Sequence, residues 1–459
     1  MKILILGAGQ VGSTVAENLV SENNDITVVD LDAKLLKQLQ DRLDIRTVAG
    51  NAAHPSVLQR AGAEDTDLML ALTRNDETNL VASKFASDLF NVPTCIARVR
   101  SSDYVEFGGD DDALARFGVD QSICPEQLVT HQLSQLFDYP GALRVLDFAD
   151  GRVQLVVVRA VEGGQLVGKA LKHIRDDLPG DVDCRVCAIY RKEQLVIPDG
   201  DTVVLDADEV FFLAPRRHVA LVLREMRKSE QPVRRVMIAG GGNIGHRLAR
   251  ALEARFAVKI IESRPERCQW LAEQVSGALV LQGEATNEEL LEDENVDEMD
   301  MFCALTNDDE DNIMSCLLAK KLGAKRVVAL VNRGSYVDLL EGDRIDVVVS
   351  PHLTTISEIL AYIRHGDVVE VHSLRRGAAE AMEIVVHGDR KTSKVVGRRL
   401  EQIAMPAGCH ISAIVRGETV QMAHHDLVVE DGDHLIIFVA KKRLIREVEK
   451  LIQPSFGFF

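Results

Sequence analysis

The sequence lacks any long apolar run. Its longest apolar patches, such as Leu435 to Ala440, are strand-sized and bounded by polar or charged residues, whereas a membrane-spanning helix needs about 18–20 apolar residues in succession. The apolar start from Met1 to Leu6 is interrupted by Gly7 and is followed by no small-residue cleavage site, so it indicates a buried strand rather than a signal peptide. We therefore expect no part of this chain to insert into a bilayer.

Positive charge is also scarce. The 459 residues include 53 Lys and Arg against 71 Asp and Glu, which gives a formal net charge of −18. Nucleic acids and anionic lipid surfaces bind proteins through clustered cations, so this balance disfavours both kinds of partner. The chain is long enough for three or four domains, because a domain typically has about 100–200 residues.

Motifs of catalysis are missing as well. The 13 histidines form no HxxxH pair, and no GxSxG or similar nucleophile motif occurs. The eight cysteines are scattered without regular spacing, which indicates reduced thiols rather than a disulfide framework. One CxxC, formed by Cys184 and Cys187, has no second pair for zinc, so a structural role is favoured over redox chemistry or metal binding. We assign no catalytic residue and no metal ligand.

What the chain does contain is a repeat. A GxGxxG pattern that begins at Gly7 returns 233 residues later at Gly240, and the same shift relates Thr73 to Thr306. The shift falls to 226 further on, because the first copy carries an extra stretch near residues 108–113. The chain is therefore two copies of one unit, each with two parts.

The first part of each copy alternates strands with helices. In copy one, apolar strands are expected near residues 2–6, 26–30, 45–49, 67–72, 94–99 and 119–123. This rhythm predicts a doubly wound parallel sheet of the Rossmann type. A polar helix near 126–137 follows it.

The second part of each copy has about eighty residues with β-branched alternation, at 153–160 and 203–213 and again at 383–386 and 427–439. The predicted fold class is α/β, with two Rossmann-type doubly wound parallel sheet domains, each followed by a small α+β domain. The expected domains are residues 1–125, 141–227, 232–350 and 367–453, and the polar segment 229–235 separates the copies.

The GxGxxG turn has a physical meaning where it joins a strand to a helix. The first glycine permits a tight turn, the second lets the backbone approach a pyrophosphate, and the third lets the helix pack close to the sheet. The phosphate then lies at the helix N-terminus, where free N–H groups point toward it. Each copy also ends its next strand in an acid, Asp30 or Glu262. Because this whole context is present twice, nucleotide binding is favoured over a purely structural turn.

The acid sets a ligand preference. It accepts hydrogen bonds from the adenosine ribose diol and repels a 2′-phosphate, so the first site is expected to prefer NAD over NADP. Asp32 strengthens this repulsion, whereas Arg264 blurs the discrimination at the second site.

Other polar residues are expected at the carboxyl edge of each sheet, where such folds bind ligands. Thr73 to Arg74 and Thr306 to Asn307 end the fourth strands. Arg98, late in the fifth strand, is placed to reach a phosphate, whereas its counterpart is Leu330. The two sites are therefore not equivalent.

Two segments have more than one interpretation. Thirteen acids and no Lys or Arg lie between Gly283 and Asn312, which is either a cation site or, more simply, a solvated acidic rim. Three phenylalanines lie in the last five residues, Ser455 to Phe459, and either tuck into the second small domain or dock on another protein.

Together these features resemble the RCK family, the regulators of potassium conductance. The resemblance covers essentially the whole chain, as an RCK N-terminal domain plus an RCK C-terminal domain, twice. It is carried by the glycine-rich opening from Gly7 to Gly12, the segments Thr73 to Asn79 and Thr306 to Asn312, and Ala97 to Val99.

The resemblance implies two nucleotide sites. The first would contain Gly7, Ala8, Gly9, Gln10, Val11, Asp30, Thr73, Arg74 and Arg98. The second would contain Gly240, Gly241, Gly242, Asn243, Ile244, Glu262, Thr306 and Asn307. The implied ligands are NAD+ or NADH and, in related systems, ATP or ADP. Leu330, together with Asn51 and Glu284 where many members carry Asp, leaves the ligand of the second site open.

It also implies a partner. Such proteins are peripheral, on the cytoplasmic side of the cell inner membrane, and bind an integral membrane potassium channel subunit of the TrkH or TrkG type. They assemble as homo-oligomers through their Rossmann domains into a ring, expected to be a tetramer, and nucleotide binding changes the ring to open or close the pore. The resemblance thus implies a regulatory subunit and no enzyme.

Two other functions remain in view. An NAD-dependent dehydrogenase is the main alternative, because this fold hosts many activities. It would need a catalytic acid or base and a substrate cleft, yet the histidines and cysteines of the small domains do not recur at matching places. The third possibility is a soluble NAD-responsive regulator without a membrane partner.

Overall fold

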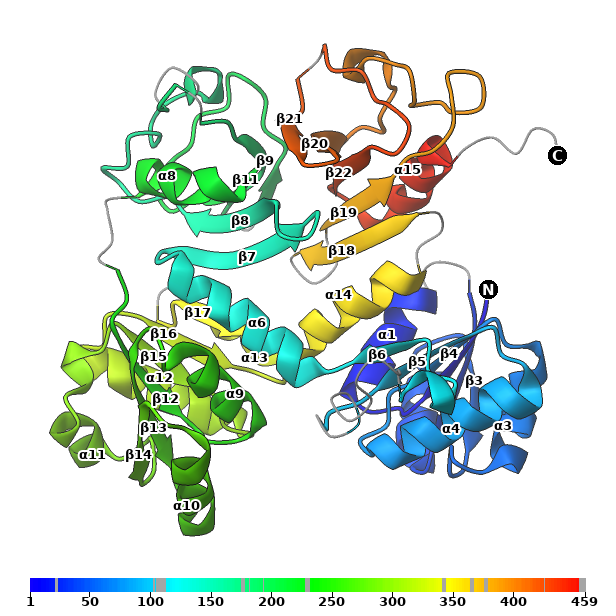
Figure 1. The fold of residues 1–459 in the computed structure, drawn as a ribbon, viewed down its shortest axis with the longest axis horizontal. Helices are drawn as coiled ribbons and strands as arrows, with labels where there is room; N and C mark the ends of the chain where they lie inside the picture. Colours follow the sequence, from blue (N-terminus) through cyan, green and yellow to red (C-terminus); the bar gives the residue numbers. More distant parts are fainter. Residues whose placement is uncertain are drawn as a thin grey trace. The chain divides into compact units, whose positions relative to one another are not determined.

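Four β-sheets organise the chain in the computed structural model (Figure 1). The structure describes residues 1–20, 24–101, 104, 113–174, 178–180, 182–192, 194–227, 232–340, 344–363, 367–374, 379–424 and 426–453. Residues 1–128 with 354–356 form one compact unit, and residues 129–353 with 357–459 form the other. Within the described ranges, no helix has the length and apolar character needed to span a membrane.

The first sheet is fully parallel, in the order β3-β2-β1-β4-β5-β6. Its strands are β1 (Lys2–Leu6), β2 (Asp25–Asp30), β3 (Arg46–Ala49), β4 (Leu68–Ala71), β5 (Thr94–Arg98) and β6 (Gln121–Ile123). Its helices are α1 (Gln10–Val20), α2 (Ala33–Gln40), α3 (Pro55–Ala61) and α4 (Asp76–Phe90). All six predicted strands are therefore confirmed, within two residues at each end.

The second parallel sheet repeats this topology, in the order β14-β13-β12-β15-β16-β17. Its strands are β12 (Arg235–Ala239), β13 (Ala257–Glu262), β14 (Ala278–Gln282), β15 (Met301–Ala304), β16 (Val327–Leu330) and β17 (Val347–Val349). Its helices are α9 (Asn243–Leu252), α10 (Pro265–Gln274), α11 (Glu288–Asp293), α12 (Asp309–Leu322) and α13 (Gly334–Leu340). In each sheet the strand order reverses beside the first strand, which is where doubly wound folds bind ligands.

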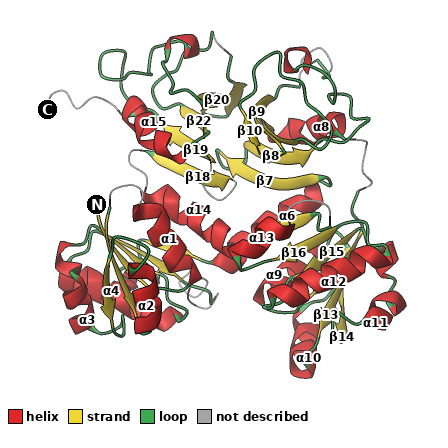
Figure 2. Ribbon diagram, turned by 180° about the vertical axis from the view of Figure 1, so that it is seen from behind, coloured by secondary structure: helices red, strands yellow, loops and turns green. Residues whose placement is uncertain are grey.

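A helix follows each parallel sheet, α6 (Pro125–Asp138) and α14 (Pro351–Ile363), and then an antiparallel sheet (Figure 2). The first antiparallel sheet contains β7 (Ala142–Phe148), β8 (Val153–Arg159), β9 (Arg185–Arg191), β10 (Gln194–Val196) and β11 (Glu209–Pro215), with helix α8 (Arg216–Met226). The second contains β18 (Val368–Leu374), β19 (Ala379–Val385), β20 (Cys409–Arg416), β21 (Thr419–Met422) and β22 (His434–Val439), with helix α15 (Ile445–Ile452). The predicted fold class, including the two small α+β parts, is confirmed.

The β-branched alternation at 203–213 and 427–439 forms strands only in its later part. Strand β11 begins at Glu209 and β22 at His434. The segments before them form turns with single β-bridges, Ala170 to Val203 and Arg399 to Val428.

A buried acid explains each turn. Asp208 accepts two hydrogen bonds from the guanidinium of Arg191, at 2.9 and 2.7 Å, and Asp433 accepts two from Arg416, both at 2.8 Å. Both carboxylates are almost fully buried. Since a buried charge needs such partners, the chain must turn to place the acid there, and regular pairing starts only afterwards.

The two small domains share one apolar core. Side chains of β7, β8, β9 and β11 pack in the same cluster as side chains of β19, β20 and β22. Polar contacts cross the same interface: Glu383 Oε2 accepts from Ala149 N at 2.7 Å, and Cys187 Sγ lies 3.4 Å from Ser412 Oγ. Burial raises the pKa of Cys187 to about 11, so this thiol stays protonated, as expected for a structural cysteine.

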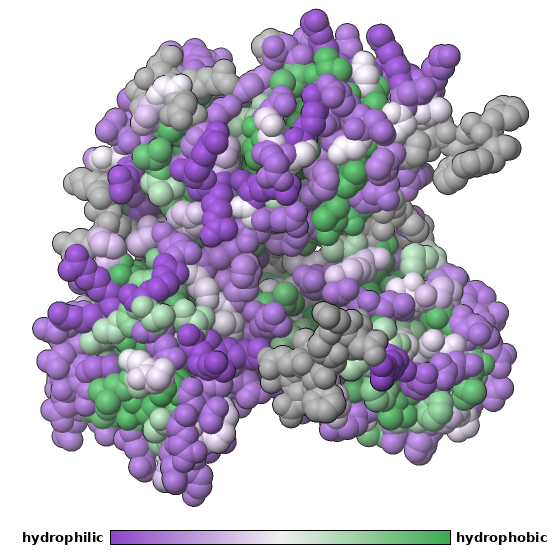
Figure 3. Space-filling model, in the orientation of Figure 1, coloured by the Kyte–Doolittle hydropathy of each residue, from purple (hydrophilic) through white to green (hydrophobic). Residues whose placement is uncertain are grey.

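The visible surface is mainly hydrophilic. Purple side chains cover most of the face drawn in Figure 3, with smaller apolar patches between them. The larger exposed apolar side chains include Leu31, at 75% exposure, beside the first glycine-rich turn, and Trp270, at 37%, near the second.

Candidate functional site

The first and third glycines of both GxGxxG turns are required by backbone geometry. Gly7 has a φ of +107° and Gly240 a φ of +102°, a region that side chains rarely tolerate. A Cβ at Gly12 would lie 1.9 Å from the carbonyl oxygen of Gly7, and one at Gly245 would lie 1.9 Å from that of Gly240. Each helix therefore starts as close to its sheet as the backbone permits.

The middle glycines have a different surrounding. A Cβ at Gly9 or at Gly242 would meet no atom within 4 Å, so space is open above both turns. Helices α1 and α9 begin directly after these glycines, at Gln10 and Asn243. The free N–H groups of their first turns suit an anionic group such as a phosphate.

Asp30 ends β2 beside the first turn. Its Oδ2 accepts a hydrogen bond from Ala8 N at 2.6 Å, and its Oδ1 accepts one from Asp32 N at 2.8 Å. Asp32 in turn caps helix α2, accepting from the backbone of Lys34 at 2.8 Å and Leu35 at 3.3 Å. Two acids two residues apart thus follow one another where β2 passes into α2, beside the first glycine turn.

Glu262 has the same place in the second copy but a different neighbour. Its Oε2 accepts from Gly241 N at 3.0 Å, and its Oε1 accepts from Arg264 N at 3.0 Å and Arg264 Nε at 3.1 Å. Burial alone would raise the pKa of Glu262. The hydrogen bonds from Arg264 and Gly241 together outweigh burial, so the pKa lies below its usual value. Glu262 is therefore an ionised carboxylate in a neutral pair.

A buried asparagine holds the loop after the fourth strand in both copies. Asn79 Oδ1 accepts from Thr73 N at 3.0 Å and Thr73 Oγ1 at 2.6 Å, and its Nδ2 donates to the carbonyl of Arg98 at 2.9 Å. Asn312 makes the same bonds to Thr306, at 2.8 and 2.8 Å, and to the end of β16 at 2.9 Å. We did not predict these asparagines as site residues, although their equal spacing from the two threonines was the available signal.

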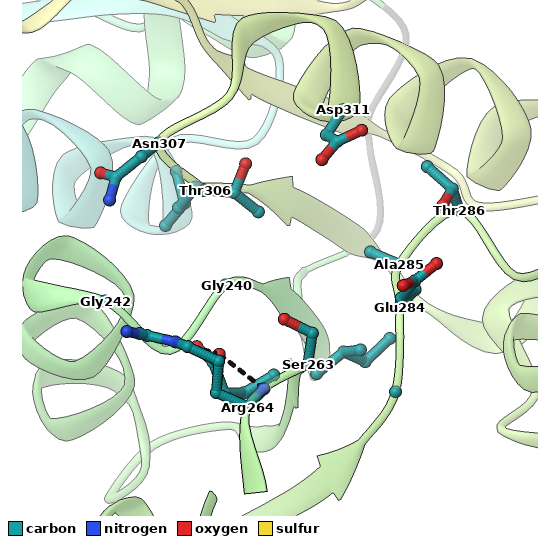
Figure 4. A pocket seen from close by; sticks show the side chains of 14 residues that line it. Gly240, Gly242, Ser263, Arg264, Glu284, Ala285, Thr286, Thr306, Asn307 and Asp311 are labelled. Atoms are coloured by element: carbon teal, nitrogen blue, oxygen red, sulfur yellow. Dashed lines mark hydrogen bonds and ion pairs between the residues drawn. The ribbon is translucent and has the colours of Figure 1, made fainter. Parts of the chain in front are cut away.

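A cleft of about 590 Å³ lies at the carboxyl edge of the second sheet (Figure 4). Of the residues predicted for the second site, those that line it are Gly240, Gly242, Glu262, Thr306 and Asn307. Gly241, Asn243 and Ile244 belong to the same turn but are not among its lining residues. Sequence reasoning did not include three other lining polar residues, Ser263, Thr286 and Asp311. Arg264 and Glu284, which it weighed only for the choice of ligand, line the cleft as well.

The residues predicted for the first site lie on the corresponding elements. Gly7, Ala8 and Gly9 form the turn, Gln10 and Val11 begin α1, and Thr73 and Arg74 follow β4. Arg98 ends β5, and its Nε is buried without a hydrogen-bond partner among the described residues. Burial lowers the pKa of this guanidinium, which nevertheless stays charged at neutral pH.

The acidic segment between Gly283 and Asn312 is paired with cations of its own domain. Lys325 Nζ lies 2.7 Å from Asp300 Oδ1, and Lys259 Nζ lies 2.7 Å from Glu294 Oε2. Further ion pairs join Glu288 to Lys321, Glu298 to Arg235 and Glu310 to Arg333. Across the described part of the chain, no cluster of three His, Cys, Asp or Glu is arranged to hold a metal ion.

Some predicted features cannot be placed. The phenylalanines of residues 455–459 and most of the extra stretch at 108–113 lie outside the described residues.

Family models match both halves of the chain. The TrkA-N domain matches residues 3–125 and 236–351, and the TrkA-C domain matches residues 155–227 and 390–453. Together with the fold, this defines a tandem RCK protein, in which a Rossmann-type domain and a small C-terminal domain occur twice.

Curated relatives identify the family more specifically. The Trk system potassium uptake protein TrkA of Halomonas elongata is 53% identical over 459 residues, 100% of both chains. That of Vibrio alginolyticus is 50% identical over 458 residues, 99% of both chains. The chain therefore belongs to the TrkA family.

Solved structures with this fold are more distant. The GsuK RCK domain has a TM-score of 0.61 at 18% identity and covers 98% of this chain and 94% of its own. A structure titled "GsuK channel bound to NAD" has a TM-score of 0.61 at 18% identity, over 98% of this chain and 79% of that one. GsuK bound to ADP has a TM-score of 0.50 at 17% identity, over 79% and 69%. At these identities the likeness is one of fold.

Proposed function

We propose that this protein is the nucleotide-binding regulatory subunit of a Trk-type potassium uptake system. One observation carries the proposal: a chain that matches TrkA relatives over their full length has, in both copies, a glycine turn and a strand-end acid of the kind that suits a dinucleotide. Its partner is an integral membrane channel subunit of the TrkH or TrkG type, which supplies the membrane span.

The proposed ligand of the first cleft is NAD+ or NADH, and ATP or ADP competes for it. The open space above Gly9 admits a pyrophosphate, and Asp30 is placed to accept from a ribose diol. The titles of the GsuK structures name NAD and ADP as ligands of that protein, which supports both classes. A bound dinucleotide would bring its adenosine ribose to Asp30 and its phosphates to the start of α1.

Gating follows from differential binding. The loops after β1, β2 and β4 lead directly into α1, α2 and α4, so a ligand held by these loops bears on all three helices. A ligand shifts a conformational equilibrium only by its difference in affinity between the two states, typically about 1–3 kcal/mol per site.

We propose that copies of the chain form a ring, expected to be a tetramer, at the cytoplasmic side of the inner membrane.

A dehydrogenase is the less favoured function. The relatives are named as potassium uptake proteins, and the described residues that line the second cleft include no histidine or cysteine. Incubation with NADH and candidate substrates tests this alternative, because turnover changes near-ultraviolet absorbance whereas simple binding does not.

The decisive experiment is potassium flux into liposomes that contain the membrane subunit, with this protein and each nucleotide added in turn. Asp30→Ala should reduce both nucleotide affinity and the nucleotide-dependent part of the flux. Glu64→Ala, an exposed acid of the same domain away from the cleft, is the matched control and should change neither. A flux that no nucleotide alters would contradict the proposal.

A further inference from the structure

The residue that ends the second strand and the two residues after it differ between the copies. Copy one has Asp30, Leu31 and Asp32, whereas copy two has Glu262, Ser263 and Arg264. An apolar side chain is thus replaced by a hydroxyl, and an acid by a guanidinium, at the edge where an adenosine ribose would lie.

Arg264 is available to a ligand. It occupies the N-cap position of α10 but makes no side-chain cap bond, and its side chain is 65% exposed. Only its Nε contacts Glu262 among the hydrogen bonds of the described residues, so the terminal guanidinium nitrogens remain for a ligand. Figure 4 shows the side chain running along the glycine-rich turn, across the cleft from Thr306 and Asn307.

Glu262 is correspondingly less able to bind a ribose diol. It is only 6% exposed, and its Oε1 accepts two hydrogen bonds from Arg264. Its charge is neutralised by the Arg264 guanidinium, whereas the two hydrogen bonds to Asp30 come from neutral backbone N–H groups. The repulsion that excludes a 2′-phosphate from the first cleft is therefore absent from the second.

More cations surround the second turn. Arg267 donates from Nε to the carbonyl of Gly241 at 2.8 Å, and its guanidinium lies 3.9 Å from the ring centre of Trp270. His246 contacts the same indole edge-on, with ring centres 4.8 Å apart.

The corresponding positions in copy one carry no cation. His246, Arg247, Arg250, Arg264, Arg267 and Trp270 correspond to Ser13, Thr14, Glu17, Asp32, Leu35 and Gln38. Four arginines thus stand where copy one has two acids and two uncharged residues. Of these four, Arg264 lines the cleft. Two lining acids, Glu284 and Asp311, stand where copy one has Asn51 and Thr78, so the gain of positive charge is local to the end of the second strand, where the adenosine ribose would lie.

We propose that the second cleft selects an adenine dinucleotide with a 2′-phosphate, NADP+ or NADPH, and that Arg264 is the residue that determines this specificity. The phosphate receives charge-assisted hydrogen bonds from Arg264 and the hydroxyl of Ser263, while the pyrophosphate lies over Gly242 at the start of α9. This rests on the proposed function in that the second cleft is taken to bind a nucleotide.

The test isolates the second cleft in the full chain. Gly9→Asp places a carboxylate in the open space where phosphates would bind the first cleft, without a clash. NADPH and NADH, which differ only in the 2′-phosphate, are then titrated by their fluorescence. NADPH should bind at least about tenfold more tightly, as expected for hydrogen bonds to a charged group. Equal affinities, tighter binding of NADH, or no binding of either would overturn the proposal.

Arg264→Asp, in the same background, installs the residue of copy one. Because Asp is a favoured N-cap residue, this variant should fold. It should abolish the preference for NADPH, Arg264→Lys should retain part of it, and an unchanged preference in Arg264→Asp would overturn the role of Arg264. Lys325→Gln removes one cation at the opposite edge of the sheet and is the control for net charge.

A second variant tests the proposed function independently of the second cleft. In Gly242→Asp, which blocks the second cleft instead, NADH should still bind the first cleft and still alter potassium flux. If the second cleft lacks the preference while the first behaves in this way, the inference fails and the proposed function stands.

Discussion

The two Rossmann-type domains of this chain share a frame and differ in their rims. The glycines that fix the turn and the asparagine that fixes the loop after the fourth strand make nearly identical contacts in both copies. The residues at the edge of the site differ in charge. Asp32 of copy one corresponds to Arg264 of copy two, and Arg98 corresponds to Leu330. Backbone geometry thus constrains the frame, meaning the turn glycines and the buried asparagine. The rim, meaning the charged residues at the edge of the site, is free to differ with the ligand.

The largest expected effect tests the shared frame. Gly12→Ala and Gly245→Ala should each destabilise their domain by about 3 kcal/mol, because the added methyl group would overlap a backbone carbonyl that cannot move away. Urea unfolding followed by circular dichroism measures the loss. Gly9→Ala and Gly242→Ala are matched controls and should change stability by less than about 0.5–1 kcal/mol, since open space receives their methyl groups. If alanine is tolerated at only one of Gly12 and Gly245, the two domains do not share the same frame.

The buried asparagines test the frame a second time. Asn79→Ala and Asn312→Ala should each lower the free energy of unfolding by about 2–3 kcal/mol, since several buried polar groups lose their partners. The same unfolding measurement applies. Gln59→Ala, which removes an exposed amide that contacts Glu64, should have little effect. A clear inequality between the two asparagines would show that the loops are held differently.

Arg98 tests the rim. Arg98→Leu installs the residue of copy two and should weaken NADH binding to the first cleft about tenfold, which corresponds to one charge-assisted contact. Stability should change little, because the buried Nε has no hydrogen-bond partner among the described residues and the loss of attraction to Glu126 and Asp76 is offset by the burial of an uncharged side chain. NADH titration in the Gly242→Asp background gives the affinity, and Arg42→Leu, at the surface beside Glu17, is the control. Unchanged affinity would remove Arg98 from the site.

The smallest effect concerns pH and the small domains. Glu370 stands where copy one has Arg144, and burial together with nearby acids, Glu358 first, raises the pKa of Glu370 from 4.5 to about 8. The folded state therefore binds this proton more tightly than the unfolded state. The free energy of unfolding should fall as the pH rises from 4.5 to about 8.

Glu370→Gln should flatten this pH dependence and raise the melting temperature slightly at pH 8, and thermal melts at several pH values measure both. Glu418→Gln, an exposed acid of the same domain, is the control. An unaltered pH profile in Glu370→Gln would contradict the expected shift.

Much of the fold could be predicted because its signals are local. Apolar strands bounded by glycine and polar residues gave the six strands of the first sheet, and the repeat extended them to the second. The late starts of β11 and β22 could not be predicted, because alternation says nothing of a buried acid such as Asp208 that meets an arginine 17 residues away.

The site was predictable to a similar degree. The turn glycines and the strand-end acids carry a spacing that sequence reveals, and five predicted residues line the second cleft. The engagement of Glu262 by Arg264, and the stacking of Arg267 on Trp270, depend on side-chain direction and were not foreseen. The positions that differ between the copies were visible in the sequence, but their common location around one turn was not.

The merged core of the two small domains has a consequence for how the copies can change. In a dimer of two identical chains, every substitution appears on both sides of the interface. Here the partners of that interface are parts of one polypeptide, so a change such as Arg264 enters one cleft of the pair and leaves the other as it was. Covalent fusion thus gives each pair a fixed one-to-one stoichiometry of two unlike Rossmann-type domains, whatever the concentration of the protein.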